Sequence, residues 1–253
     1  MKISILTIFP DFFPPALGEG MIRAARERER LEVDVVRLRD FTLDSHRTTD
    51  DYPFGGGVGM IMKVEPIHRA LESLGVAEKG RRDPGTRVIV LTPQGRLFTQ
   101  DAARAYATLK HVILVCGRYK GVDERVTEHL ADEELSLGDF VLSGGEPAAL
   151  CVVDAVARLL PGVVGDFDSV ESDSFHSGLL DSPYYTRPAE YQGWRVPEVL
   201  LSGNHAEIAR FRRQQALCRT FERRPELLGS APLSDEDRRF LLSLQRAKEP
   251  RSG

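Results

Sequence analysis

Short apolar runs alternate with helix-like segments along the first half of the chain. Four of these runs read as strands, at residues 2–9, 33–38, 87–91 and 111–116. The last two are almost continuously apolar, which is typical of strands in a parallel sheet that is covered on both faces. Helix-compatible segments occupy 16–30 and 99–109. This alternation predicts an α/β fold built on a parallel sheet.

The same pattern continues to residue 160 and then changes. A helix-like stretch at 122–130, a short strand at 140–142 and a helix at 146–160 follow one another. A Pro-Gly pair at 161–162 is a stop signal for the last of these helices. Residues 164–173 are rich in Asp, Ser, Glu and Gly, a composition that predicts a flexible linker.

Helical patterns return near the C-terminus, at 204–228 and 234–247. Asn204 followed by Glu207 resembles a capping box, and Ser234 suits the start of the last helix. The sequence therefore predicts an α/β domain at 1–163, a flexible linker at 164–175 and a small helical domain at 176–253.

The composition is that of a globular protein, with 42% hydrophobic and 28% charged residues. Its three cysteines, Cys116, Cys151 and Cys218, are far apart and show neither disulfide nor zinc-site spacing. No apolar stretch is long enough to span a bilayer. These features favour a cytoplasmic protein with no membrane partner and no histidine or cysteine metal site.

Charge is unevenly distributed along the chain. The net charge is −4, which argues against attraction to nucleic acid by the whole surface. Residues 205–224, in contrast, contain six arginines and two glutamates, a local charge of +4. This stretch is either a solvated helix face or a surface that contacts phosphates.

Glycine-rich or polar loops are the clearest chemical feature. The chain has neither a phosphate-binding P-loop nor the GxGxxG fingerprint of dinucleotide-binding proteins. The loops lie at 50–60, 92–95, 117–121 and 137–145. Glycine lets backbone groups approach a flat ligand closely. Each loop by itself could be a tight turn, but three loops after successive strands predict a ligand cradle at one edge of the sheet.

Together these segments resemble the bacterial tRNA (guanine-N1)-methyltransferase family, the TrmD family, from residue 2 to about 228. The motifs that carry the resemblance are DDYPFGGGVGM at 50–60, PQG at 93–95, CGRY at 116–119, GDFVLSGGE at 138–146, DAVAR at 154–158, PG at 161–162, DSF at 173–175, GLLD at 178–181, YTRP at 185–188 and LSG at 201–203.

The resemblance implies a SPOUT-type parallel sheet with a deep trefoil knot, a small C-terminal α-helical domain that binds tRNA, and a homodimer whose sites are shared between subunits. It also implies transfer of a methyl group from S-adenosylmethionine to N1 of the guanosine immediately 3′ of the anticodon. No periodicity predicts a knot, because knots are nearly absent from proteins.

Site residues follow from the same resemblance. It assigns S-adenosylmethionine to Thr92, Pro93, Gly95, Gly117, Tyr119, Leu137, Gly138, Asp139, Phe140, Val141, Leu142, Gly144 and Gly145. It assigns tRNA contacts to Asp50, Gly55, Gly59, Ser174, Arg187, Arg210 and Arg213. One of the two carboxylates at 50–51 could instead cap a turn.

The resemblance makes Asp173 the catalytic base and Arg158 the contact to the target guanine. A neutral guanine carries a proton on N1, so a base must remove it as the methyl group transfers. A guanidinium near O6 would stabilise the negative charge that develops. From spacing alone, Asp173 could be a solvated linker residue and Arg158 a surface partner of Asp154.

Two positions depart from the family pattern. Lys120 stands where the family usually has glutamate, which argues against Mg²⁺ as a second cofactor, and Asn204 stands where histidine is frequent. Lys120 also motivates an alternative, a non-catalytic RNA-binding protein on the same scaffold. A nucleotide-dependent oxidoreductase would fit the strand–helix alternation, but the missing fingerprint counts against it.

Overall fold

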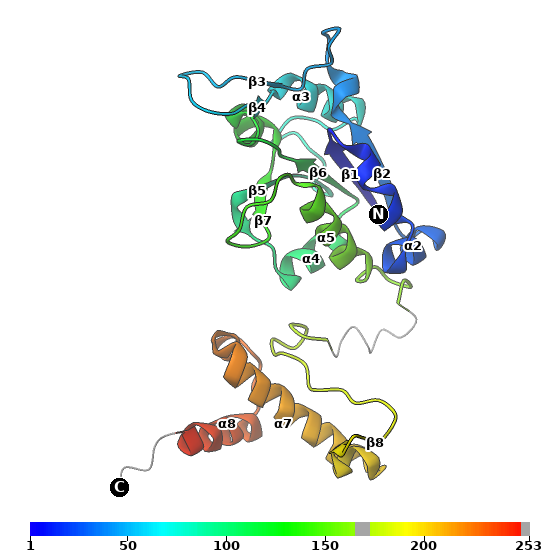
Figure 1. Ribbon diagram of the computed structural model, residues 1–253, viewed down its shortest axis with the longest axis vertical. Coiled ribbons are helices and arrows are strands. Elements are labelled where there is room, and N and C mark those ends of the chain that lie inside the picture. Colours follow the sequence, from blue (N-terminus) through cyan, green and yellow to red (C-terminus); the bar gives the residue numbers. More distant parts are fainter. Residues whose placement is uncertain (165–172, 249–253) are drawn as a thin grey trace. The chain divides into compact units, whose positions relative to one another are not determined.

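The computed structural model describes residues 1–164 and 173–248 (Figure 1). The chain divides into two compact units, Met1–Gly165 and Asp166–Gly253, and each is described here by itself. Most of the predicted linker, 165–172, lies outside the described residues.

A five-stranded parallel sheet forms the centre of the first unit. Its strands are β1 (Lys2–Thr7), β2 (Glu32–Arg37), β5 (Thr86–Leu97), β6 (His111–Cys116) and β7 (Glu133–Ser136). Their order across the sheet is β2-β1-β6-β5-β7, and all four pairings are parallel. The predicted α/β fold with a parallel sheet is confirmed.

Side chains alternate between two cores on the two faces of the sheet, because successive residues of a strand point in opposite directions. In β6, Val112 and Leu114 join one core, whereas Ile113 and Val115 join the other. The first core is covered by α1 (Pro14–Leu17), α2 (Gly20–Glu27), α4 (Gln100–Ala107) and α5 (Glu146–Ala157). The second is covered by η2 (Leu38–Phe41), α3 (Val64–Ser73) and the π-helical turn η3 (Val126–Leu130).

The first unit also contains a 3₁₀ turn and a pair of short strands outside the central sheet. A short 3₁₀ turn, η1 (Pro10–Phe12), follows β1. The strands β3 (Asp50–Asp51) and β4 (Ile61–Met62) pair with each other in antiparallel orientation. They hold the ends of the glycine-rich loop between them.

The strand predicted at 140–142 was wrong. These residues lie in a loop, and the fifth strand is β7, at Glu133–Ser136. Phe140 and Val141 are 54% and 85% exposed, so their apolar character does not reflect a place in the core. β7 begins with two glutamates, so the sequence does not show it as an apolar run.

Several predicted helices are shorter than expected. Of residues 122–130, only 124–130 are helical, the last five as a π-helix. The helix predicted at 146–160 ends at Ala157, four residues before Pro161, and a turn follows it.

The second unit contains α7 (His205–Arg223) and α8 (Asp235–Lys248), as predicted. The side chain of Asn204 accepts a hydrogen bond from the Glu207 amide at 3.3 Å, so the predicted cap is confirmed. The Ser234 hydroxyl likewise caps α8. The 3₁₀ turns η4 (Glu198–Leu201) and η5 (Pro225–Gly229) flank α7, and β8 (Glu190–Tyr191) pairs with β9 (Trp194–Arg195). The core is Leu179, Leu217 and Leu241.

An ion pair joins the two long helices of this unit. The Arg213 guanidinium donates to both carboxylate oxygens of Asp237, at 3.1 and 2.8 Å, and the Asp237 side chain is 8% exposed. These hydrogen bonds lower the pKa of Asp237 to about 2.

We expect Asp237→Asn to lower the free energy of unfolding of the second unit by about 2 kcal/mol at pH 7. Because the folded-state pKa of Asp237 is depressed, the contribution is complete above about pH 4 and disappears as the pH falls toward 2. Chemical denaturation followed by circular dichroism at pH 7 and pH 3 measures the difference. Asp235→Asn, at an exposed position two residues earlier, is the control, and equal losses in both variants would refute the assignment.

Candidate active site

The ends of β6 and β7 lie beside the middle of β5 at one edge of the sheet. Leu91 of β5 lies opposite both Cys116 of β6 and Leu135 of β7. The loops at 92–95, 117–121 and 137–145 start at or just beyond these residues. The structure therefore brings the predicted cofactor loops to the carboxyl edge of the sheet, where α/β proteins bind their ligands.

The first loop is a bulge inside β5. The pairing register with β7 shifts between Leu91 and Arg96, both of which lie opposite Leu135. Thr92, Pro93 and Gly95 occupy the extra residues. A Cβ atom on Gly95 would lie 2.2 Å from the Leu135 nitrogen, so only glycine allows the two backbones to approach so closely.

The second and third loops are joined through their backbones. The Gly145 amide donates to the Gly117 carbonyl at 2.9 Å, and Arg118 forms an antiparallel bridge with Gly144. A Cβ atom on Gly145 would lie 2.7 Å from the Cα atom of Cys116. Glycines at these positions thus bring the two loops into direct contact, with backbone groups rather than side chains between them.

The same loops expose several large side chains to solvent. Tyr119 is 52% exposed and adopts a left-handed conformation with φ of 59°. Phe140, Val141 and Leu142 are also exposed, and Asp139 lies beside them. Leu137 and Gly138 are partly buried. This edge therefore presents an apolar surface that a flat ligand or a partner could cover.

A buried carboxylate lies beneath the loops. Glu146, the first residue of α5, is 0% exposed and accepts a hydrogen bond from the Thr7 hydroxyl at 2.7 Å. Arg118 donates to the same carboxylate from Nε at 3.1 Å and from Nη2 at 3.0 Å, and its guanidinium lies 4.3 Å from the Phe9 ring centroid. A buried charge needs such partners. The cluster ties β1, the second loop and α5 together.

Sequence reasoning missed the role of this cluster, although both Arg118 and Glu146 lie in motifs of the family resemblance. A glutamate directly after two glycines at a helix start was the available signal. Burial raises the pKa of the neighbouring Cys116 thiol, with a further contribution from the charge of Glu146. Cys116 is therefore a protonated core residue and not a nucleophile.

The predicted tRNA-reading loop is bonded to the second cofactor loop. The Lys120 amide donates to the Met60 carbonyl at 3.1 Å, and the Met62 amide donates to the Gly121 carbonyl at 3.0 Å. Asp50 lies opposite Met62 at the other end of the loop. This segment therefore lies directly beside the loop that carries Lys120.

Glycine conformations shape the loop that follows Asp50. Gly55 and Gly59 have positive φ angles, of 83° and 101°. A Cβ atom on Gly59 would lie 3.0 Å from Cγ of Lys120, whose own side chain is exposed. The lysine that replaces the family's glutamate thus lies between the predicted cofactor and tRNA sites.

The predicted catalytic pair is divided between the two units. Arg158 is an exposed residue directly after α5 in the first unit. Asp173 and Ser174 belong to the second unit, where they begin a turn. Two hydrogen bonds hold this turn, one from the His176 amide to the Asp173 carbonyl and one from the Asp181 amide to the Ser174 hydroxyl. The pairing of Arg158 with Asp173 stays a prediction.

The remaining predicted tRNA contacts also belong to the second unit. Arg187 is exposed in the segment before β8. Arg210 lies 3.5 Å from Glu236, and both side chains are largely exposed. Arg213 holds Asp237 and therefore also stabilises the packing of α7 on α8. Contact with RNA stays a prediction for all three arginines.

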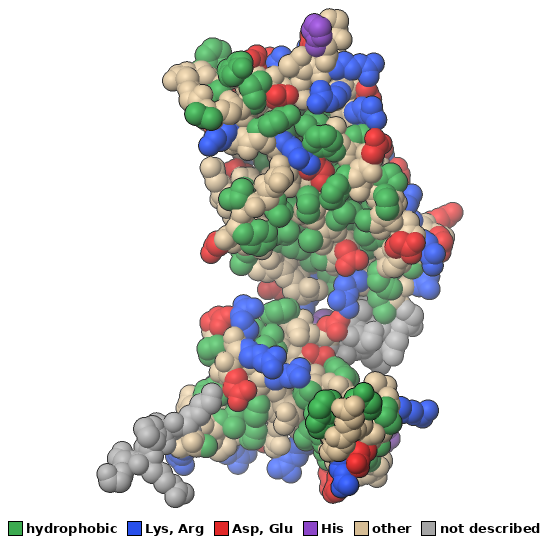
Figure 2. Space-filling view, in the orientation of Figure 1, with side chains coloured by type: hydrophobic (Ala, Val, Ile, Leu, Met, Phe, Trp, Pro, Cys, Tyr) green, Lys and Arg blue, Asp and Glu red, His purple; other side chains and the backbone are tan. Residues whose placement is uncertain are grey.

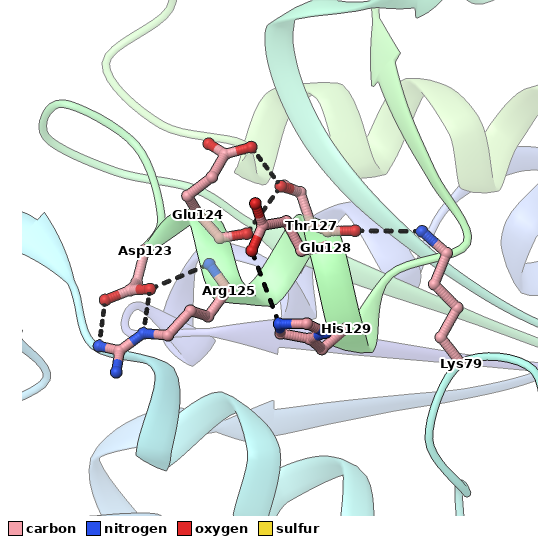
Figure 3. Close-up of polar contacts among 7 residues, drawn as sticks. All are labelled: Lys79, Asp123, Glu124, Arg125, Thr127, Glu128 and His129. Atoms are coloured by element: carbon pink, nitrogen blue, oxygen red, sulfur yellow. Dashed lines mark hydrogen bonds and ion pairs between the residues drawn. The ribbon is translucent and has the colours of Figure 1, made fainter.

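A pocket of about 450 Å³ opens elsewhere on the first unit, between α3 and η3. It is lined by Val64, His68, Glu78, Lys79, Arg125, Glu128, His129 and Leu130. Figure 3 shows polar contacts of some lining residues: Arg125 pairs with Asp123 at 2.6 Å, Lys79 donates to the Thr127 carbonyl at 3.3 Å, and His129 lies 3.6 Å from Glu128. Because its lining contains none of the predicted site residues, it is a weaker candidate than the loop edge.

Within the described ranges, no group of three or more His, Cys, Asp or Glu side chains is arranged to hold a metal ion. No helix of the described chain is long and apolar enough to cross a membrane.

The chain is similar to one protein family over most of its length. The family described as tRNA (Guanine-1)-methyltransferase TrmD matches residues 1–230. The chain belongs to this family. Curated relatives extend the match over nearly the whole chain. A protein of Moorella thermoacetica named tRNA (guanine-N(1)-)-methyltransferase is 50% identical over 252 residues, covering 100% of both chains.

Relatives of the same name in other bacteria are equally similar. The one in Symbiobacterium thermophilum is 54% identical and covers 95% of this chain and 97% of its own. The one in Geotalea uraniireducens is 52% identical, with 97% and 98% covered. Family membership makes the chain a methyltransferase and excludes the oxidoreductase alternative.

Proposed function

We propose that the protein methylates N1 of the guanosine immediately 3′ of the anticodon in tRNA, with S-adenosylmethionine as donor. The observation that carries this proposal is the family match over residues 1–230, together with relatives about 50% identical over their full length that are named tRNA (guanine-N(1)-)-methyltransferase. The family loops also converge at the carboxyl edge of the sheet.

The arrangement of the loops fits the proposed cofactor. S-adenosylmethionine supplies a methyl group activated by its sulfonium charge, and its adenine is flat. Gly95, Gly117, Gly144 and Gly145 bring three backbones together where side chains would collide. Backbone amide and carbonyl groups at this edge would bind the adenine edges. Thr92, Pro93, Tyr119 and the residues 137–142 would surround it.

Asp173 would take the N1 proton of guanine, and Arg158 would stabilise the charge that develops on O6. In this proposal the first unit supplies Arg158 and the second unit supplies Asp173. Asp50, Gly55 and Gly59 would bind the base next to the target, and Ser174, Arg187, Arg210 and Arg213 would contact the tRNA.

We further propose the trefoil knot and a homodimer with shared sites. The backbone contacts between the loops at 117–121 and 137–145 are compatible with a knotted edge. α5 contains only two charged residues, but part of this apolar helix is accessible to solvent: Cys151 is exposed and Leu150 is only partly buried. Figure 2 shows apolar side chains at the surface of the first unit, over the region where Figure 1 draws α4 and α5. An exposed apolar surface of this kind favours contact with a second subunit. We place the protein in the cytoplasm, where tRNA is modified.

A non-catalytic RNA-binding role would require this chain to have lost the activity of its family, and the exposed Lys120 beside Gly59 is the observation that motivates a test. Transfer of a radiolabelled methyl group to tRNA transcripts separates the two. We expect transfer to a transcript with guanine 3′ of the anticodon and none when that guanine is replaced by adenine. Tight tRNA binding without transfer would establish the non-catalytic role instead. The same assay with EDTA determines whether Mg²⁺ takes part despite Lys120.

A further inference from the structure

A small hairpin in the second unit presents two aromatic rings to solvent. Tyr191 of β8 and Trp194 of β9 lie directly opposite each other in the antiparallel register. Directly opposite residues project from the same face of a hairpin. Their ring centroids are 5.9 Å apart with an interplanar angle of 57°, and the side chains are 56% and 71% exposed.

The hairpin holds these rings in a fixed arrangement. Its two-residue turn, Gln192-Gly193, has φ angles of 52° and 82°, the left-handed conformation of the turns that best match the twist of paired strands. Glu190 and Arg195 lie opposite each other on the other face, with the carboxylate and Nε 2.8 Å apart. The ion pair occupies one face of the hairpin and leaves the aromatic face to a partner.

The residues around the hairpin favour a nucleobase as that partner. Every residue from 184 to 195 is exposed, and four of them are Tyr or Trp. None is Leu, Ile, Val or Met, so the large apolar side chains of this segment are all aromatic. Exposed aromatic faces are the platforms on which the bases of single-stranded RNA stack.

The local charge is also that of an RNA-binding surface. The segment 184–195 contains two arginines and one glutamate, and α7 adds five arginines against two glutamates. The Arg212 guanidinium lies 5.6 Å from the ring centroid of Tyr184, so arginine and aromatic side chains are interleaved here. Positive charge attracts phosphates while ring faces accept bases.

We propose that Tyr191 and Trp194 form a stacking platform for an unpaired base of the tRNA. This inference rests on the proposed substrate. Because the two rings are tilted, a flat base can lie parallel to only one of them. Trp194, the larger and more exposed ring, stacks on the base, and Tyr191 contacts the edge of that base.

Trp194 is the only tryptophan in the chain, so its fluorescence reports on this contact alone. We expect an unmodified tRNA transcript to quench it, in the absence of S-adenosylmethionine. A blunt RNA duplex of similar charge, which offers no unpaired base, should leave it nearly unchanged. Trp194→Ala should raise the KM for tRNA about tenfold with little change in kcat. Trp194→Phe should recover most of the loss, and Tyr191→Ala should have a smaller effect.

Leu201→Ala is the matched control, since Leu201 is a 61% exposed side chain in the neighbouring η4. Circular dichroism verifies that the exposed substitutions leave the fold intact. Absence of quenching, equal quenching by the duplex, or an unchanged KM in Trp194→Ala overturns the platform even when methyl transfer is normal. Fluorescence that instead depends on protein concentration identifies a second copy of the chain as the partner and also overturns it. Quenching by tRNA without any methyl transfer supports the platform while contradicting the proposed function.

Discussion

Replacing Asp173 by alanine should reduce methyl transfer by about 10²–10⁴-fold, the usual contribution of a general base, and leave the affinity for S-adenosylmethionine unchanged. The reason is that the carboxylate is required only when the N1 proton leaves the guanine. Asp173→Asn, which keeps the size and removes the charge, should be equally impaired. Single-turnover transfer to tRNA measures the chemical step, and calorimetric titration measures cofactor binding.

His176→Ala is the control for this experiment, because His176 is an exposed side chain in the same turn and its hydrogen bond to Asp173 is made by the backbone. It should retain activity. Full activity of Asp173→Ala would show that another group takes the proton. A simultaneous loss of cofactor affinity would mean that the turn supports the cofactor loops instead.

Replacing Gly95 by alanine should have the second large effect. The new Cβ atom would lie 2.2 Å from the Leu135 nitrogen and 2.3 Å from the Glu134 carbonyl carbon, distances that real atoms do not tolerate. Either β5 or β7 must move at the edge where the cofactor loops begin. We expect a loss of about 1–3 kcal/mol in stability, as is usual for overpacking, and at least about a tenfold loss of S-adenosylmethionine affinity.

Gly229→Ala is the matched control, since no atom lies within 4 Å of a Cβ built on Gly229. Thermal unfolding and cofactor titration of both variants provide the comparison. If Gly95→Ala bound S-adenosylmethionine as tightly as the unmodified protein, the bulge in β5 would not be part of the cofactor site.

The central strands could be predicted because their burial on two faces requires long apolar runs. β6 was located to the residue, at His111–Cys116. Prediction failed at the edge of the sheet, where β7 contains Glu133 and Glu134 and exposed apolar residues follow it. β7 and the loop that follows it are not apolar in proportion to their burial, so the sequence pattern does not reveal them.

In the candidate site, too, local features could be predicted from the sequence and tertiary contacts could not. Local sequence could suggest that Gly95 belongs to a loop, but not that its Cα lies against Leu135, forty residues further along the chain. The pairing of Arg213 with Asp237 is likewise a tertiary contact. The predicted roles of Asp173 and Arg158 and the predicted knot came from the family resemblance alone. A knot depends on the path of the whole chain and leaves no periodic signal in the sequence.

The hydrogen bonds between the loops at 50–60 and 117–121 have a thermodynamic consequence. Neither Met60–Met62 nor Lys120–Gly121 can shift far without breaking them or moving the other segment. In the proposed arrangement, where these loops bind tRNA and the cofactor, occupancy of one loop is linked to the conformation of the other. Whatever factor the cofactor contributes to the affinity for tRNA, tRNA must contribute to the affinity for the cofactor, because such coupling is reciprocal.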